Sequence, residues 1–186
     1  MSEESSRVSV IGAGSWGTAL ACVLAAGGET FLWARDAELA AAMNRDRHNP
    51  RYLQDAQIPE SVRVTADLAD AVYRVPVIIL AVPAKAMRAT ARGISGIMRT
   101  QARRGADVPL LLSAAKGLDP ETGALMSQVL AESLGDRAVI GALSGPNIAR
   151  EVAAGLPAAT VIACADGPRA LVAQRRVSSN RLRAYT

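Results

Sequence analysis

The stretch VSVIGAGSWGTALACVLAAGG, residues 8–28, combines a short apolar run, three closely spaced glycines and a second, longer apolar run. The first run is continuous and rich in β-branched residues, which favours a buried strand over residues 7–12. The second run places Ala, Val and Leu at helical spacing over residues 15–26, and Gly27 and Gly28 end the pattern. We therefore predict a strand, a glycine turn and a helix, in that order.

The three glycines, Gly12, Gly14 and Gly17, have the spacing of the G-x-G-x-x-G dinucleotide fingerprint. In that motif the first glycine permits a tight turn, the second lets the backbone approach a pyrophosphate, and the third lets the helix pack against its strand. Free N–H groups and the helix dipole then favour an anion at the helix start. A lone match also fits a plain tight turn, but a strand before and a helix and strand after it favour dinucleotide binding.

Strand-like and helix-like segments alternate along the rest of the chain. The clearest strand is VPVIILAVP, residues 75–83, whose unbroken apolar run fits a parallel strand that is covered on both faces. The alternation predicts an α/β fold with a doubly wound, mostly parallel, Rossmann-type sheet. Further strands are expected near residues 29–35, 62–65, 108–117, 137–147, 157–165 and 181–186, with helices near 66–73, 148–155 and 167–179.

Four local expectations are more specific. Asp36 is placed to cap a helix that runs to about Arg45. Residues 48–60 look like a loop punctuated by prolines, and residues 84–99 look like a helix that breaks near Gly93. Asp119 followed by Pro120 has the signature of a helix start, so a helix is expected to begin there.

Composition narrows the class of protein. The 186 residues, half of them hydrophobic, suit one domain or slightly more. The net charge is +4 and the pI about 9.6, but the arginines are scattered without interleaved aromatics, so we do not expect nucleic-acid binding. The N-terminus does not resemble a signal peptide, and no apolar run approaches the ~20 residues of a membrane span. Cys22 and Cys164 lack metal-ligand spacing and read as reduced thiols of a cytoplasmic protein, with no metal site.

The end of the second strand indicates which cofactor is preferred. In dinucleotide-binding folds a carboxylate there favours NAD through the ribose 2′-hydroxyl, whereas an arginine accommodates the 2′-phosphate of NADP. Arg35 stands at this position, and Asp36 is better placed as a helix cap. We expect NADP(H) to be preferred and NAD(H) to be accepted, unless Arg35 is only a solvated strand end.

Polar residues follow two later strands. The chain has 19 arginines among its 21 basic residues and only two lysines, Lys85 and Lys116. Lys116 can offer a compact positive charge to a phosphate or carbonyl oxygen, and the alternative is that it is a solvated loop lysine. We interpret Lys85 as a solvated residue at a helix start. Gly145 and Asn147 offer backbone and amide donors, or only an ordinary capped loop. His48, the single histidine, reads as a surface or structural residue.

Taken together, these stretches resemble bacterial NAD(P)-dependent glycerol-3-phosphate dehydrogenase, and the match runs along nearly the whole chain. The matching stretches are GAGSWGTALA (12–21), LWARD (32–36), NPRYL (49–53), ILAVPA (79–84), AAKGL (114–118) and LSGPNIAREVAAGLPAATVIA (143–163).

The resemblance implies reduction of dihydroxyacetone phosphate to sn-glycerol 3-phosphate, a precursor in phospholipid biosynthesis. It places Ser15, Trp16, Arg35, Tyr52 and Ala149 at the cofactor, Lys116 at cofactor and substrate, and Gly145 and Asn147 at the substrate. It also implies a helical second domain and a proton-transfer lysine beyond Thr186. We therefore expect residues 1–186 to be the cofactor-binding domain alone, with a core over 7–177, a connection starting at 178–186 and no catalytic residue of its own.

Two other interpretations remain open. A related two-domain reductase, such as a ketopantoate reductase, shares the glycine turn, but AAKGL followed by SGPNIAREV argues against it. A dinucleotide-binding module without chemistry is the second alternative, and the natural length of the protein would distinguish it from an enzyme. Apolar surface that a second domain would cover can instead pair two copies in a homodimer.

Overall fold

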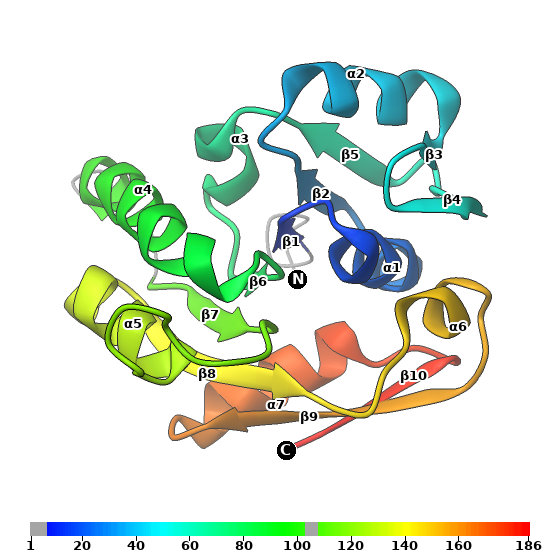
Figure 1. Ribbon diagram of the computed structural model, residues 1–186. Helices are drawn as coiled ribbons and strands as arrows, with labels where there is room; N and C mark the ends of the chain where they lie inside the picture. Colours follow the sequence, from blue (N-terminus) through cyan, green and yellow to red (C-terminus); the bar gives the residue numbers. More distant parts are fainter. Residues whose placement is uncertain (1–6, 103–107) are drawn as a thin grey trace.

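An eight-stranded sheet organises the chain in the computed structural model, which describes residues 7–102 and 108–186 (Figure 1). The strand order is β10-β9-β8-β7-β6-β1-β2-β5, and every neighbouring pair is parallel except β8 and β9. The mostly parallel α/β sheet that the sequence predicts is therefore confirmed. The strands are β1 (Val8–Ile11), β2 (Thr30–Trp33), β5 (Val62–Thr65), β6 (Val77–Leu80), β7 (Leu110–Ser113), β8 (Val139–Ser144), β9 (Ala158–Cys164) and β10 (Leu182–Tyr185).

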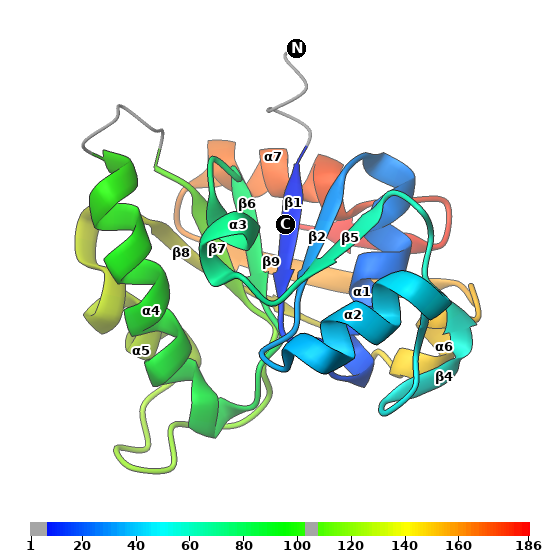
Figure 2. The ribbon, with the colours of Figure 1, turned by 90° about the horizontal axis from the view of Figure 1, so that it is seen from above.

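Helices cover both faces of the sheet. One face packs against α1 (Ser15–Leu24), α2 (Ala37–Asp46) and α7 (Gly167–Val177), and the other against α3 (Leu68–Val72), α4 (Ala84–Ala102) and α5 (Met126–Leu134). Figure 2 shows α4 and α5 side by side on their face of the sheet. A short helix, α6 (Ala149–Ala153), packs on α1, and single 3-10 turns η2 (Ala25–Gly27) and η3 (Gly135–Arg137) follow α1 and α5.

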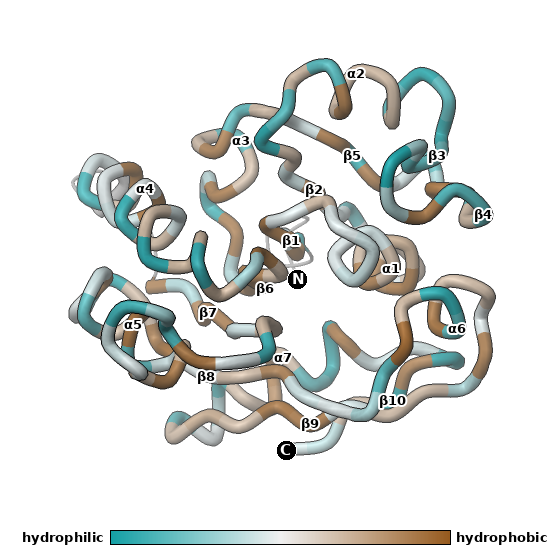
Figure 3. The backbone as a smooth tube through the Cα atoms, in the orientation of Figure 1, coloured by the Kyte–Doolittle hydropathy of each residue, from teal (hydrophilic) through white to brown (hydrophobic). Residues whose placement is uncertain are grey.

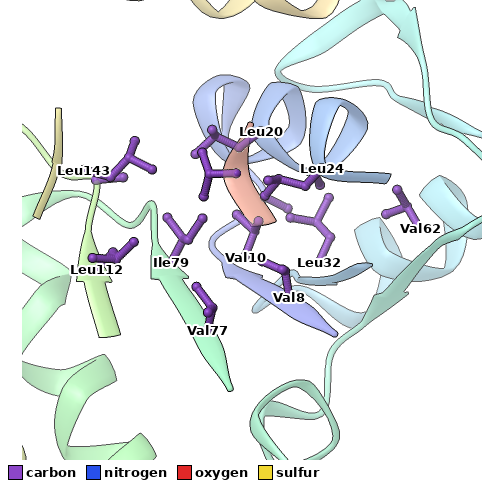
Figure 4. Close-up of a cluster of buried hydrophobic side chains, with 14 of the residues drawn as sticks. Val8, Val10, Leu20, Leu24, Leu32, Val62, Val77, Ile79, Leu112 and Leu143 are labelled. Carbon is purple, nitrogen blue, oxygen red and sulfur yellow. The ribbon is translucent and has the colours of Figure 1, made fainter. Parts of the chain in front are cut away.

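Strand β6 shows why its sequence is continuously apolar. Its residues alternate between two buried clusters, with Val77 and Ile79 facing the α1 side and Ile78 and Leu80 facing the α4 side. Figure 4 shows side chains of β1, β2, β6 and β7 pointing toward Leu20 and neighbouring residues of α1. In Figure 3 the hydrophobic colours gather on these central strands. Burial on both faces removes the polar alternation expected of a strand with one wet side.

The segment after α2 is not the plain loop that the sequence suggested. It forms a two-stranded antiparallel hairpin, β3 (His48–Asn49) and β4 (Leu53–Gln57), which lies beside α1 and α6 (Figures 1 and 2). Asn49 is fully buried, and its Nδ2 donates to the carbonyl oxygen of Ala13 at 2.9 Å and to Thr18 Oγ1 at 2.8 Å. These long-range hydrogen bonds tie the hairpin to the glycine turn.

Two local expectations about helices are wrong. The α4 helix continues through Gly93 without a break, and the missing side chain there lets Leu68 of α3 approach the helix closely. No helix begins at Asp119, because residues 119–124 form a turn and α5 starts at Met126. The Asp119 carboxylate, instead of capping a helix, accepts hydrogen bonds from Arg88 at 2.8 Å and from Thr122 at 2.7 Å.

Other local expectations are confirmed. The Asp36 carboxylate caps α2 by accepting hydrogen bonds from the backbone N–H groups of Glu38 and Leu39. The strand predicted near residues 181–186 is present as β10, which pairs with β9 at the edge of the sheet. Both cysteines are free. Within the described residues, no helix combines the length and the apolarity that crossing a membrane requires.

Candidate functional site

A pocket of about 730 Å³ opens where strands β1, β2, β6, β7 and β8 end. Strand β1 lies inside the sheet, with β2 and then β5 on one side of it and β6 and then β7 on the other. The direction in which the chain adds strands therefore changes at β1. Ligands of open α/β sheets bind at such a switch point, outside the carboxyl ends of the strands. The pocket is therefore the candidate functional site.

The pocket gathers all but one of the residues that the sequence analysis assigns to cofactor or substrate. The exception is Gly17, which is buried within α1 and does not line the pocket. What the others bind stays a prediction, but their meeting in one cavity is an observation. They are Gly12, Gly14, Ser15, Trp16, Arg35, Tyr52, Lys116, Gly145, Asn147 and Ala149.

The three glycines of the turn differ in what surrounds them. Gly12 has φ +118°, a left-handed conformation that side chains rarely adopt, and a Cβ there would lie 2.9 Å from the Ala81 carbonyl oxygen. A Cβ on Gly17 would lie 1.8 Å from the Gly12 carbonyl oxygen, so helix and turn are in direct contact. A Cβ on Gly14 would meet nothing within 4 Å, although Gly14 lines the pocket. Gly12 and Gly17 therefore serve the fold, whereas the space above Gly14 is open to a ligand.

The first turn of α1 faces this open space. Gly14 is the N-cap residue, and no side chain within the described residues caps the helix. The Ser15 hydroxyl is engaged elsewhere, since it donates to the carbonyl oxygen of Tyr52 in the hairpin at 2.8 Å. An uncapped helix start presents N–H groups and a positive dipole end, which suits a phosphate or another anion.

The pocket wall at the end of β2 carries two arginines and one carboxylate. Arg35 is exposed and makes no hydrogen bond or ion pair with another residue in the described part of the chain. Asp36 forms an ion pair with Arg51 from the hairpin, and both line the pocket. The helix-cap hydrogen bond from Leu39, and then the hydrogen bond from Arg51, lower the pKa of the Asp36 carboxyl below its ordinary 3.8. Asp36 is therefore held as a carboxylate.

The opposite wall carries both lysines of the chain. Lys116 follows β7, and Lys85 lies in the first turn of α4; both side chains are exposed and line the pocket. Lys85 is thus the exposed residue at a helix start that the sequence predicts, and it also lines the pocket. Asn147 also lines the pocket, and its Nδ2 is buried without a hydrogen-bond partner among the described residues. These groups are chemically suited to oxygen atoms of a polar or anionic ligand.

Trp33, Arg51 and Lys85 are among the pocket residues that were not predicted from the sequence as site residues. Trp33 is fixed by a hydrogen bond from its Nε1 to the carbonyl oxygen of Ala66 at 3.0 Å. Arg51 enters through the hairpin, and Lys85 through the turn after Pro83. Trp33 is the last residue of β2 and Lys85 follows β6, so a position at or after a strand end was the available signal for both. His48, in contrast, is exposed in β3 and lies outside the pocket.

The known proteins to which the chain is similar are dehydrogenases. Residues 7–170 match the family described as NAD-dependent glycerol-3-phosphate dehydrogenase N-terminus. The chain is 45% identical over 183 residues to glycerol-3-phosphate dehydrogenase [NAD(P)+] 2 of Mycobacterium bovis, covering 97% of this chain and 53% of that protein. It is 46% identical over 182 residues to the glycerol-3-phosphate dehydrogenase [NAD(P)+] of Nocardia farcinica, with the same coverage.

Solved structures agree. The crystal structure of glycerol-3-phosphate dehydrogenase from Coxiella burnetii superimposes with a TM-score of 0.85 at 30% identity, covering 96% of this chain and 53% of that one. The yeast glycerol-3-phosphate dehydrogenase superimposes with a TM-score of 0.78 at 25% identity, covering 96% of this chain and 55% of that one. The chain thus spans about half the length of the relatives that it matches.

Proposed function

Since the chain belongs to the family of NAD-dependent glycerol-3-phosphate dehydrogenase N-terminal domains, we propose that it binds NADP(H), and more weakly NAD(H), in the pocket at the strand ends. The observation that carries this proposal is the open position at Gly14 beside the uncapped first turn of α1. A pyrophosphate in that position receives backbone N–H groups at close range, as the fingerprint requires.

The two ends of the pocket are suited to the two ends of a dinucleotide. The adenosine ribose belongs at the end of the second strand of such folds, where Arg35 stands. A guanidinium without a partner among the described residues favours a ribose that carries a 2′-phosphate, which supports NADP(H) as the preferred cofactor. The nicotinamide then points toward the wall that holds Lys116 and Asn147.

The substrate we propose is dihydroxyacetone phosphate, reduced to sn-glycerol 3-phosphate in the cytoplasm. A bound reduced nicotinamide supplies the hydride. Lys116 donates a hydrogen bond to the carbonyl oxygen, which gains negative charge as the reaction proceeds. Asn147, which lines the pocket, holds a second substrate oxygen through its side-chain amide, and Gly145 keeps the space beside that amide clear.

We expect residues 1–186 on their own to bind the cofactor without turning over this substrate. Both lysines of the pocket are exposed. Water therefore screens the electrostatic stabilisation that their ammonium groups can give to a developing negative charge. We propose that the proton-transfer lysine implied by the resemblance belongs to the part of the relatives that this chain does not cover. Positioning of a small substrate between two walls supplies roughly 7–11 kcal/mol of a typical barrier, and these residues form one wall.

The tryptophans allow a direct test. The chain has two, Trp16 and Trp33, and both line the pocket. Titration with NADPH should quench their emission through energy transfer to the reduced nicotinamide, with saturation at one molecule per chain. Unchanged tryptophan emission at millimolar NADPH would refute cofactor binding. Loss of reduced-nicotinamide absorbance on addition of dihydroxyacetone phosphate, compared with a full-length relative, tests the expected lack of turnover.

A further inference from the structure

Asp36 and Arg51 form a charge pair at the place where the ribose of the proposed cofactor would lie. The Asp36 Oδ1 accepts the two helix-cap hydrogen bonds, from Glu38 N at 3.0 Å and Leu39 N at 3.1 Å. The Oδ2 accepts a hydrogen bond from Arg51 Nη1. Both carboxylate oxygens are thus engaged before any ligand arrives.

A carboxylate in this position ordinarily selects against a 2′-phosphate. It hydrogen-bonds the ribose 2′-hydroxyl of NAD, and it repels the two negative charges of the phosphate in NADP. The chain carries such a carboxylate directly after Arg35, so the two neighbours favour opposite cofactors. Arg51 resolves this conflict, because its guanidinium neutralises Asp36 and remains half exposed, with 51% of its side chain accessible.

The backbone of Arg51 is held firmly relative to the glycine turn. The Arg51 N–H donates to the Oδ1 of Asn49 at 3.2 Å. Asn49 is in turn fixed through its Nδ2 to Ala13 and Thr18, on either side of the helix start. The hairpin therefore presents Arg51 to the pocket from a position that is set by buried hydrogen bonds.

We propose that Arg51 determines cofactor specificity, neutralising Asp36 and supplying a second guanidinium to the 2′-phosphate of NADPH. This inference rests on the proposed function, since it concerns the same pocket. Hydrogen bonds to charged groups change affinity by about tenfold or more each, so removing Arg51 should affect NADPH strongly. NADH has no 2′-phosphate and should be affected little.

The test compares the dissociation constants of NADPH and NADH for four forms of the full chain: wild type, Arg51→Ala, Asp36→Asn and Arg45→Ala. Asparagine is as good a helix cap as aspartate, so Asp36→Asn removes the charge and leaves the start of α2 intact. Arg45 is the matched control, because it forms a similar exposed ion pair with Asp46 at the far end of α2 and does not line the pocket. Circular dichroism checks that each variant is folded.

In Arg51→Ala we expect NADPH affinity to fall about tenfold or more and NADH affinity to change less than about twofold. Asp36→Asn should shift the ratio of the two affinities the other way, and Arg45→Ala should leave it unchanged. An unchanged ratio in Arg51→Ala, including an equal loss for both cofactors, would overturn the inference while leaving the proposed function intact. If Arg51→Ala does not fold, the inference stands or falls on the direction of the shift in Asp36→Asn. A wild-type chain that binds neither cofactor would overturn the proposed function, and this inference with it.

Discussion

A Cβ atom on Gly17 would lie 1.8 Å from the carbonyl oxygen of Gly12, so the third glycine of the turn is pressed against the backbone of the first. The obstacle is backbone rather than a flexible side chain, and relief requires α1 to move away from β1. This contact fixes the position of the helix start above the pocket.

Gly17→Ala should therefore destabilise the whole domain. Overpacking of a well-packed site typically costs 1–3 kcal/mol, and we expect about 3 kcal/mol here because the contact is with backbone. Urea denaturation followed by circular dichroism measures the change. A variant as stable as the wild type would show that α1 can shift freely.

Arg35→Ala should weaken NADPH binding more than NADH binding. The 2′-phosphate would lose a charge-assisted hydrogen bond, worth about 1.5–3 kcal/mol. Titration calorimetry with both cofactors measures the difference, and Arg45→Ala again serves as the control away from the pocket. Equal losses for the two cofactors would contradict the assignment of Arg35 to the 2′-phosphate.

Asn49→Ala should lower both stability and cofactor affinity. Asn49 is fully buried, and its loss leaves Ala13 and Thr18 without donors in the interior, which typically costs about 1–3 kcal/mol. The hairpin that presents Tyr52 to the pocket also loses its anchor.

The matched control is Asn44→Ala. Asn44 also joins two segments, through hydrogen bonds with the backbone of Val64, but it does not line the pocket. We expect this control to lose stability and to keep its NADPH affinity, measured on the folded variant. Similar affinity losses in both variants would mean that Asn49 acts only through general stability.

The Asp119–Arg88 pair should make stability depend on acid pH. The hydrogen bond from Arg88, followed by that from Thr122, lowers the pKa of the Asp119 carboxyl below its ordinary 3.8. A depressed pKa means that the pair stabilises the fold above about pH 4 and that this stabilisation is lost as the pH falls through the lowered value. Asp119→Asn should therefore lower the melting temperature near neutral pH, with a difference from wild type that shrinks in acid.

Glu132→Gln is the control for this prediction. Glu132 pairs with the same Arg88 at 2.8 Å but is largely exposed, so its removal should change the melting temperature little at any pH. A pH-independent difference between Asp119→Asn and wild type would contradict the proposed role of the charge.

The parts of the fold that the sequence predicts correctly depend on signals between near neighbours. The apolar run of β6 and the Asp36 cap of α2 both fall within a few residues, and both are present in the structure. The turn with Gly12 and Gly14 was also predicted from a local spacing, although the backbone carbonyl that crowds Gly12 belongs to the distant Ala81.

The incorrect predictions arise where a residue that is distant in sequence makes a contact that overrides a local sequence pattern. Asp119 has the residue type and the sequence context of a helix cap, but its carboxylate accepts a hydrogen bond from Arg88, which lies 31 residues away. The hairpin around Arg51 depends on Asn49 reaching Thr18, which also lies 31 residues away. No local pattern reports such contacts, so Arg51 was missed although it lies next to Tyr52, which the resemblance had placed at the cofactor.

The central claim is that the glycine turn binds the pyrophosphate of a dinucleotide, and Gly14→Val tests it most directly. A Cβ atom on Gly14 would meet no other atom within 4 Å, and φ of −76° is ordinary for valine, so the fold should survive. The same side chain would occupy the space where the pyrophosphate must approach the backbone. Calorimetric titration should show one NADPH bound per wild-type chain and none bound to a Gly14→Val variant whose circular dichroism is unchanged. Normal NADPH affinity in that folded variant would contradict the account.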